Sequence, residues 1–348
     1  MIELRNLTLF EIETLITSFG EPKYRAKQLF DWVHKGIDNF EEITNISKGL
    51  RAKLAEISFL ENMKISEKFV SKLDETTKYL LQLRDGNFIE CVLMKYKHGY
   101  TVCISTQAGC KMGCKFCASS HAEFVRNLTA GEMLGQVLLA ACEVERLTNG
   151  EGKRVSNVVL MGIGEPLDNF DNVLKFIELV NSPDGINIGQ RHISLSTCGL
   201  ADKILELAKL NLQITLSVSL HATSDAKRRE IMPINMRFDL NKLLSACQEF
   251  VKITGRRISF EYALIDGVND DKQTANDLVT LLKQYFKPNL IHLNLISINY
   301  VKEAGFVRSA RAEGFRAELE RKGVTATLRR ELGSDIAAAC GQLRSSKT

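Results

Sequence analysis

The sequence predicts an α/β protein in which six consecutive βα units share one parallel sheet. From residue 101 onward, apolar segments rich in β-branched residues recur at strand length, and helical segments separate them. Strands that alternate with helices in this order form parallel sheets with short right-handed crossovers. The 348 residues, with 45% hydrophobic and 25% charged side chains, suffice for one such domain and a small accessory domain.

The region before the βα units is expected to be helical first and then β. Residues 1 to about 60 carry apolar side chains at helical spacing, with a break at residues 20–22, where Gly and Pro occur. Between Lys78 and Tyr96 the pattern changes to that of two strands. Residues 84–87 contain Asp-Gly between these strands, which is a strong signal for a β-hairpin turn.

Each βα unit can be placed by its apolar pattern. The predicted strands span residues 101–106, 155–162, 192–197, 214–221, 257–264 and 290–298. The predicted helices span residues 130–147, 170–181, 199–209, 239–254 and 271–286, followed by a helix near 310–322 and a strand near 324–330. Thr129 followed by Glu132 predicts a capping box at the start of the first helix. Either a doubly wound sheet or an incomplete βα barrel fits, and both place ligands at the carboxyl ends of the strands.

Composition and charge exclude several classes of protein. The apolar run 134–142 is too short to cross a bilayer, and the N-terminus shows no secretory pattern, so we expect a cytoplasmic protein without membrane association. Nine cysteines, an odd number, do not suggest a disulfide framework in such a protein. The net charge of +4 permits a nucleic-acid partner, and the cationic run 227–229 fits such a contact or, more commonly, a solvated face.

Three cysteines, Cys110, Cys114 and Cys117, lie in one short loop after the first strand of the βα series. Three thiolates can hold three irons of a [4Fe-4S] cubane and leave the fourth iron open to a chelating molecule such as S-adenosylmethionine (SAM). A ferredoxin-type carrier would require a fourth cysteine nearby. A structural zinc site completed by His121 is the alternative. The Cys-x-x-x-Cys-x-x-Cys spacing is specific to radical SAM enzymes.

Polar residues follow several predicted strands at their carboxyl ends. The second strand leads into a Gly-x-Gly-Glu-Pro segment at residues 162–166, whose backbone and carboxylate suit the ammonium group of a methionine. The third ends at residues 196–197, the fourth at 219–221 and the sixth at 297–299, each with polar side chains. One such end means little. Four of them, on the rim that also carries the cysteine loop, predict a ligand site there.

These motifs together resemble the RlmN/Cfr family of radical SAM RNA methyltransferases, and the resemblance covers essentially the whole chain. It rests on the cysteine loop and on residues 164–166, 191–197, 219–222, 267–270 and 335–343. The family fold is an incomplete, TIM-like (βα)6 barrel behind a small helical domain. The resemblance implies an RNA-contacting helical domain at residues 1–75, a β-hairpin extension at 76–100, a radical SAM core at 101–300 and a C-terminal segment with a methylated cysteine at 301–348.

The resemblance also implies an activity. Family members methylate carbon 2 (RlmN) or carbon 8 (Cfr) of an adenine in 23S ribosomal RNA, and RlmN enzymes also act on transfer RNA. Residues 333–335 and 191–193 look more like RlmN, so we expect carbon-2 methylation, with the carbon-8 reaction as the alternative. The cofactors would be one [4Fe-4S] cluster and two SAM per turnover, with flavodoxin or ferredoxin as electron donor. A non-catalytic iron–sulfur or zinc protein that binds RNA is the alternative from another class.

Individual roles follow from the same resemblance. Cys340 would carry the methyl group, Cys103 would release the product through a transient disulfide with Cys340, and Glu90 would accept a proton. The cysteine loop would hold the cluster, and the implied SAM-binding residues are Gly164, Glu165, Ser196, Ser219, Leu220, His221 and Asn299. Without the resemblance, Cys103 and Cys340 would be read as core residues and Glu90 as an exposed strand carboxylate.

The other cysteines have structural interpretations. Cys142 and Cys247 lie on apolar faces of predicted helices, which predicts burial in the core. Cys91 directly follows Glu90 in a predicted strand, so the two side chains should point to opposite faces of the sheet.

Overall fold

The protein is described from a computed structural model that covers residues 1–61, 63–97, 99–301 and 303–344. Its centre is a ten-stranded sheet in the order β14-β13-β12-β11-β10-β9-β6-β5-β4-β3. The strands from β14 to β6 pair in parallel, and the pairs that join β6, β5, β4 and β3 are antiparallel. The parallel strands are β6 (Gly99–Cys103), β9 (Val155–Leu160), β10 (Ile193–Thr197), β11 (Thr215–Ser219), β12 (Ile258–Leu264), β13 (Ile291–Ser297) and β14 (Ala326–Leu328).

The strand order decides between the two predicted architectures. Each parallel strand pairs with the next parallel strand along the chain, so the order never reverses as it does at the switch point of a doubly wound sheet. In the described chain, β14 pairs with β13 alone, so the sheet is left open. A sheet whose parallel strands follow one another in chain order, but which does not close on itself, is an incomplete βα barrel, as predicted.

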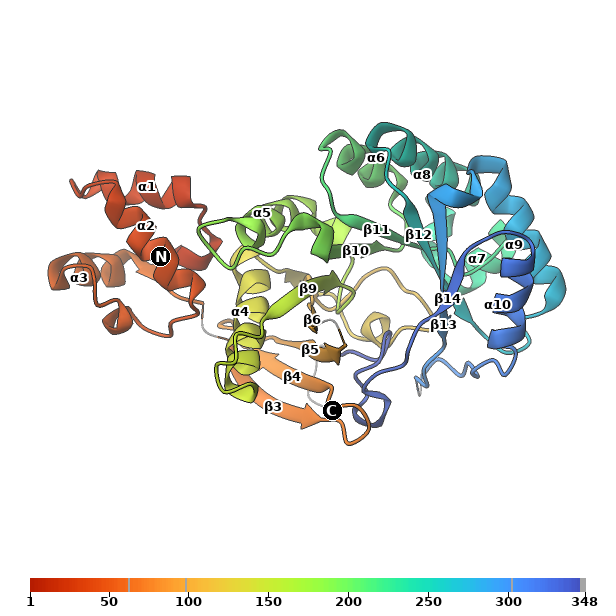
Figure 1. The fold of residues 1–348 in the computed structure, drawn as a ribbon, viewed down its shortest axis with the longest axis horizontal. Helices are drawn as coiled ribbons and strands as arrows, with labels where there is room; N and C mark the ends of the chain where they lie inside the picture. The colour runs from red at the N-terminus through yellow and green to blue at the C-terminus, as the bar shows by residue number, and fades with distance from the viewer. Residues whose placement is uncertain (62, 98, 302, 345–348) are drawn as a thin grey trace.

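Helices cover the outer side of the parallel strands (Figure 1). They are α4 (Ala130–Leu147), α5 (Phe170–Asn181), α6 (Ala201–Lys209), α7 (Asp225–Ile231), α8 (Leu240–Thr254), α9 (Lys272–Tyr285) and α10 (Ala312–Arg321). All except α7 were predicted, and α4 and α5 have the predicted bounds. α7 was missed because its seven residues, mostly charged, are too few to show an apolar period.

Alternation along the strands directs polar side chains to the inner face of the parallel sheet. In β10, Ile193, Leu195 and Thr197 are buried, whereas Ser194 and Ser196 are only partly buried. The two apolar residues belong to the main hydrophobic core beneath the helices. Because side chains in a strand alternate between faces, the serines face the inside of the open barrel. The polar strand ends noted in the sequence therefore look inward.

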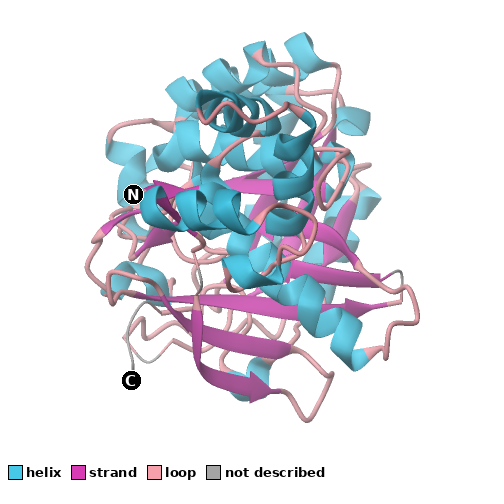
Figure 2. Cartoon of the chain, turned by 90° about the vertical axis from the view of Figure 1, so that its left-hand side faces the viewer, coloured by secondary structure: helices cyan, strands magenta, loops and turns pink. Residues whose placement is uncertain are grey.

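The antiparallel strands form the extension predicted as a hairpin. β4 (Thr77–Gln82) and β5 (Phe88–Tyr96) flank the predicted turn, and an unpredicted strand β3 (Lys64–Val70) pairs with β4. Figure 2 shows broad strands across the lower half of the view, with most of the helices above them. Cys91 belongs to the main core, whereas Val92 packs in a smaller cluster with the C-terminal segment. Glu90 and Cys91 therefore point to opposite faces, as predicted.

The N-terminal region is helical, with the predicted break. α1 (Leu9–Ser18) ends just before residues 20–22, and α2 (Tyr24–His34) begins just after them. α3 (Lys48–Ile57) follows, and the short strands β1 (Ile2–Glu3) and β2 (Ser58–Phe59) pair to bring the ends of this region together. The three helices lie at one end of the molecule, beyond α4 and α5 (Figure 1).

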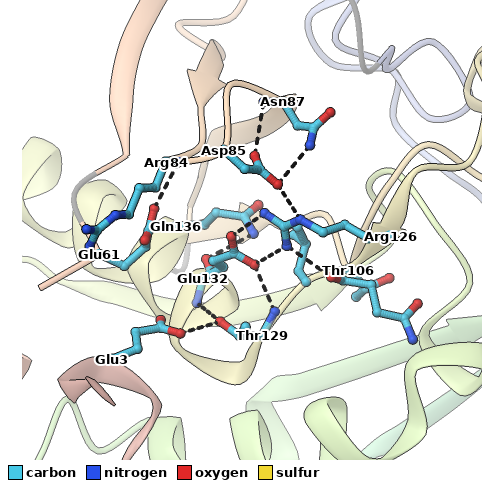
Figure 3. A network of polar contacts seen from close by, with 12 residues as sticks. Glu3, Glu61, Arg84, Asp85, Asn87, Thr106, Arg126, Thr129, Glu132 and Gln136 are labelled. Atoms are coloured by element: carbon cyan, nitrogen blue, oxygen red, sulfur yellow. Dashed lines mark hydrogen bonds and ion pairs between the residues drawn. The ribbon is translucent and has the colours of Figure 1, made fainter. Parts of the chain in front are cut away.

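Polar contacts join the N-terminal region to the start of α4 (Figure 3). The Thr129 hydroxyl donates to Glu3 Oε2 at 2.9 Å, and the Thr129–Glu132 capping box has formed as predicted. Arg126 donates to both carboxylate oxygens of Glu132, at 2.7 and 2.8 Å. A Cβ at Gly131 would lie 1.8 Å from Glu3 Oε1 and 2.9 Å from the backbone nitrogen of Asn6, so a larger residue would force this contact to shift. We refer to Glu3, Glu61 and Glu132, all at this contact, as the junction group.

All nine cysteines are free. Cys247 is buried in the core as predicted. The prediction for Cys142 was wrong, because the buried positions of α4 lie mainly in its N-terminal part and Cys142 faces outward near its end. In the described part of the chain, no helix combines the length and the apolar character that crossing a membrane requires.

Candidate active site

A pocket lies at the carboxyl ends of β9 to β13, bounded by the cysteine loop and by the C-terminal segment. Its wall contains most of the site residues expected from the sequence, namely Cys110, Cys114, Cys117, Gly164, Glu165, Ser196, Ser219, His221, Asn299 and Cys340. A second pocket contains Cys103 and shares six residues with the first, namely Met161, Ile296, Asn299, Arg329, Cys340 and Leu343. Glu90 and Leu220 line neither pocket. The two pockets therefore border each other along the shared residues, Cys340 among them.

The cysteine loop has a backbone shape that depends on glycine. At Gly109, φ is +79° and a Cβ would lie 1.9 Å from the carbonyl oxygen of Glu123. The Cys117 amide donates to the Cys114 carbonyl at 3.1 Å, which tightens the turn between these two cysteines. Burial raises the pKa of Cys110 to about 12 and also raises the pKa of the other two thiols. Because burial disfavours the charged thiolate form, these cysteines would lose their protons when bound metal cations compensate the negative charge.

The loop supplies three thiols, which suits a cubane that binds one thiolate at each of three irons. Across the described residues, no three His, Cys, Asp or Glu side chains are gathered closely enough to hold one metal ion. Ser120 Oγ and Asn299 Oδ1, both from residues of the pocket wall, are buried polar atoms without a hydrogen-bond partner in the structure. They are open to a polar ligand in the pocket.

Glu165 joins the ends of two neighbouring strands. Its carboxylate accepts from the amide of Leu167 at 3.0 Å and from the amide of Cys198, beyond the end of β10, at 2.7 Å. Burial raises the pKa of Glu165, and these hydrogen bonds oppose the shift. Next to it, Gly164 has φ of +105°, and a Cβ there would lie 2.6 Å from the side chain of Gln107. The Gly-Glu pair is thus held rigidly at the pocket wall.

His221 is present as a neutral ring in a fixed orientation. The Ala263 amide donates to His221 Nδ1 at 2.9 Å, so the ring proton lies on Nε2. Burial lowers the pKa of His221 to about 3, and the charge of Arg228 adds to this effect. Phe116 from the cysteine loop packs edge-on against the ring, with centroids 4.8 Å apart. His221 therefore offers the pocket a neutral hydrogen-bond donor.

Arg228 organises the same rim and was missed from the sequence. The run 227–229 was interpreted as an RNA contact or a solvated face, yet the Arg228 side chain is fully buried. Its guanidinium donates to the carbonyls of Cys198 (2.7 Å), Ser219 (3.0 Å) and Leu220 (3.1 Å). It thereby ties the ends of β10 and β11 together and occupies the Leu220 carbonyl. The sequence gives no sign that a charged residue in a basic run is buried. The burial of Arg228 arises only when α7 packs against the ends of the strands.

The C-terminal segment closes the pocket and carries Cys340. Asn299 Nδ2 donates to the Cys340 carbonyl at 2.9 Å, and the Ala118 amide donates to the Gly341 carbonyl at 2.7 Å. Cys340 is thus held between the cysteine loop and the residues that follow β13. Cys103 lies at the end of β6, where burial raises its pKa to about 12 and the guanidinium of Arg329 opposes the shift. Both cysteines line the second pocket.

Glu90 is buried, and the expectation of an exposed carboxylate from strand pattern alone was wrong. Its side chain forms an ion pair with Lys78 at 3.0 Å and accepts from the backbone amide of Arg344 at 2.8 Å. Burial raises the pKa of Glu90, while Lys78 and Arg344 oppose this shift. The burial arises because the C-terminal segment covers this face of β5, a contact that spans most of the chain.

Known proteins resemble this chain over its entire length. Residues 2–60 match the family described as the ribosomal RNA large subunit methyltransferase N-terminal domain, and residues 104–278 match the radical SAM superfamily. Two similar proteins are named probable dual-specificity RNA methyltransferase RlmN. The one from Clostridium perfringens is 52% identical over 99% of this chain and 97% of its own length. The one from Caldanaerobacter subterraneus is 51% identical over 99% of this chain and 98% of its own length. The crystal structure of a radical SAM methyltransferase from Sphaerobacter thermophilus superposes with a TM-score of 0.93 at 40% identity, covering 99% of both chains.

Proposed function

Because this chain belongs to the RlmN family of radical SAM RNA methyltransferases, we propose that it methylates carbon 2 of adenine 2503 in 23S ribosomal RNA and of adenine 37 in transfer RNAs. The observation that supports this proposal best is the meeting of the two pockets. One contains the cysteine loop and the polar strand ends, and the other contains Cys103. Cys340 belongs to both, as a residue that passes a methyl group between two ligands must.

The chemistry explains why two cysteines are needed. Carbon 2 of adenine lies between two ring nitrogens and is electron-poor, so it does not attack the methyl group of SAM directly. When bound, the [4Fe-4S] cluster and SAM supply a methyl group and a 5′-deoxyadenosyl radical. Cys340 carries the methyl group to the base, Glu90 accepts the proton from carbon 2, and Cys103 attacks the Cys340 sulfur to release the product. Both thiols are free in this structure, as the start of a cycle requires.

The residues around the first pocket have separate binding tasks. The cysteine loop would hold the cluster. Gly164, Glu165, Ser196, Ser219, His221 and Asn299, with the backbone of Leu220, would bind SAM. Glu165 presents a carboxylate to the methionine ammonium, and the neutral His221 presents a donor.

Other parts of the proposal concern partners. Residues 1–75 would contact the RNA. Cationic side chains would attract the phosphates of its backbone. A low-potential carrier such as flavodoxin or ferredoxin would deliver the electron. Ribosomal and transfer RNA as substrates place the enzyme in the cytoplasm.

Deletion of the gene tests the function directly. We expect 2-methyladenosine to disappear from ribosomal and transfer RNA of the deletion strain, as measured by nucleoside mass spectrometry, and to return when the wild-type gene is supplied. Supplying Cys340→Ala should restore none of it, because the methyl carrier is missing. Cys247→Ala, a core cysteine away from the pockets, is the matched control and should restore methylation. An unchanged level in the deletion strain, or loss of 8-methyladenosine instead, would contradict the proposal.

A further inference from the structure

Lys78 is a buried lysine that contacts Glu90, the implied proton acceptor. It lies in β4 with 8% of its surface exposed. Its ammonium group contacts Glu90 Oε1 at 3.0 Å and donates to the carbonyl of Ala337 at 3.2 Å. Ala337 lies three residues before Cys340 in the C-terminal segment. Lys78 therefore bridges the carboxylate and the segment that carries the reactive cysteine.

The sheet register places this pair beside Cys103. Lys78 pairs with Val92 across β4 and β5, and Val92 pairs with Cys103 across β5 and β6. Directly paired side chains share a face, and Glu90, two residues before Val92, shares it too. Lys78, Glu90 and Cys103 thus lie on the face that the C-terminal segment covers.

Two cationic residues face Glu90, and they differ in what they offer it. Arg344 donates its backbone amide to Glu90, while its guanidinium is bound to Glu303 through two contacts of 2.9 Å. Within the described part of the chain, the carboxylate that Lys78 pairs with is that of Glu90. Lys78 is therefore the cation whose charge is directed at Glu90.

We propose that Lys78 is a positioning residue for Glu90, which keeps the carboxylate ionised and oriented and at the same time anchors the Cys340 segment above it. The inference rests on the proposed function. In the proton step, the C–H bond at carbon 2 of the Cys340-linked adenine breaks, and its electron pair stays with the base adduct. The proton bonds to a carboxylate oxygen of Glu90, which becomes a neutral acid. Only an ionised Glu90 can accept it.

The electrostatics set the direction of the effect. Burial raises the pKa of Glu90, and the charge of Lys78 is the largest influence that opposes it. Without Lys78, a buried carboxylate would be left with the Arg344 amide and would be protonated at a higher pH. A base is active only above its pKa, so loss of Lys78 must move the acidic limb of the rate profile to higher pH.

The test compares Lys78→Met, Lys78→Gln and Lys78→Arg in the full-length, cluster-loaded enzyme. The measurements are the single-turnover rate of 2-methyladenosine formation as a function of pH and the amount of RNA covalently attached to Cys340. We expect Lys78→Met and Lys78→Gln to be slower by about 10- to 100-fold near neutral pH. Their acidic limbs should shift upward, partial recovery should occur at high pH, and attached RNA should accumulate. Lys78→Arg, which keeps the charge, should restore the wild-type profile. Lys95→Met removes an exposed lysine paired with Glu75 on the same sheet extension and should behave as wild type.

Lys78→Gln separates charge from anchoring, because its amide can still donate to the Ala337 carbonyl. A wild-type pH profile for Lys78→Gln would overturn the proposal. Equal losses in all three variants at every pH, without attached RNA, would overturn it as well and would assign Lys78 a purely structural role. If the wild-type enzyme itself forms no 2-methyladenosine, the proposed function fails instead, so the two failures are distinguishable.

Discussion

Among the described residues, two groups of buried or partly buried carboxylates can be compared by the partners that hold them. The junction group lies at the contact between the N-terminal region and α4. Arg126 donates twice to Glu132 and the Thr129 hydroxyl donates to Glu3, while backbone amides also donate to Glu132 and Glu61. The pocket group, which we define as Glu165 and Glu261 in the pocket wall together with Glu90 outside it, is held by Lys78, by backbone amides and by the Asn294 amide. Figure 3 shows the junction group.

Burial alone does not distinguish the two groups. Burial raises the pKa of Glu3 to about 7 and also raises the pKa of Glu61, as it does for Glu90 and Glu165. A raised pKa is often used to locate active sites, but structural networks shift pKa values as well. What distinguishes the pocket group is its place: Glu165 and Glu261 line the pocket that also contains Cys340 and the cysteine loop, and Glu90 lies beneath the segment that carries Cys340. The junction group joins two parts of the chain.

The largest expected contrast comes from the same substitution in each group. Glu165→Gln should lower the rate of 2-methyladenosine formation by about 100-fold, because the neutral side chain no longer offers a negative charge to SAM. In addition, the NH2 group of Gln would face a backbone N–H, and two donors cannot form a hydrogen bond. Glu132→Gln should leave this rate within about 3-fold and lower the free energy of unfolding by ~2 kcal/mol, because it breaks the paired contact with Arg126. Nucleoside mass spectrometry and urea unfolding measure the two effects. Equal losses of activity in both variants would remove the distinction between the groups.

The second contrast is between Arg228, the buried arginine at the pocket rim, and its exposed neighbour Arg229. Arg228→Met should lower the free energy of unfolding by ~3 kcal/mol, because it leaves three strand-end carbonyls without their buried donor. Arg229→Met, at the exposed neighbouring position, should change it by less than ~0.5 kcal/mol. Equilibrium urea denaturation of both variants provides the comparison. If the two substitutions cost the same, Arg228 does not hold the rim together.

The smallest effect is a pH dependence in the junction group. Glu3 has a pKa of about 7 in the folded protein and 4.5 as its ordinary value. The folded state therefore binds the proton more tightly, so the stability contributed at this site is present below about pH 4.5 and is lost as the pH rises through 7. Glu3→Gln should remove this loss and stabilise the protein by roughly 1 kcal/mol above pH 7. Thermal unfolding of both proteins between pH 5 and pH 8 would reveal it. Parallel curves across this range would show that Glu3 is ionised in the folded state.

Much of the architecture followed from local pattern. The bounds of α4 and α5, the capping box at Thr129, the turn before β5 and the break between α1 and α2 were all predictable, because each depends on residues within a few positions of one another. The strand β3 and the helix α7 were missed. Both are rich in charged residues, so their apolar pattern is weak, and contact with the sheet makes them regular.

The sequence by itself determined the chemical inventory and the order of the elements: a loop with three cysteines, polar residues at successive strand ends and a series of βα units. Spacing along the chain is enough for these features. The tertiary structure alone decided which charges are buried and which distant residues meet. Cys103 and Cys340 share one pocket, Lys78 reaches both Glu90 and Ala337, and Arg228 is enclosed by strand ends. Such contacts depend on strand register and on the path of the C-terminal segment, which are set by the packing of the whole chain rather than by any short stretch of it.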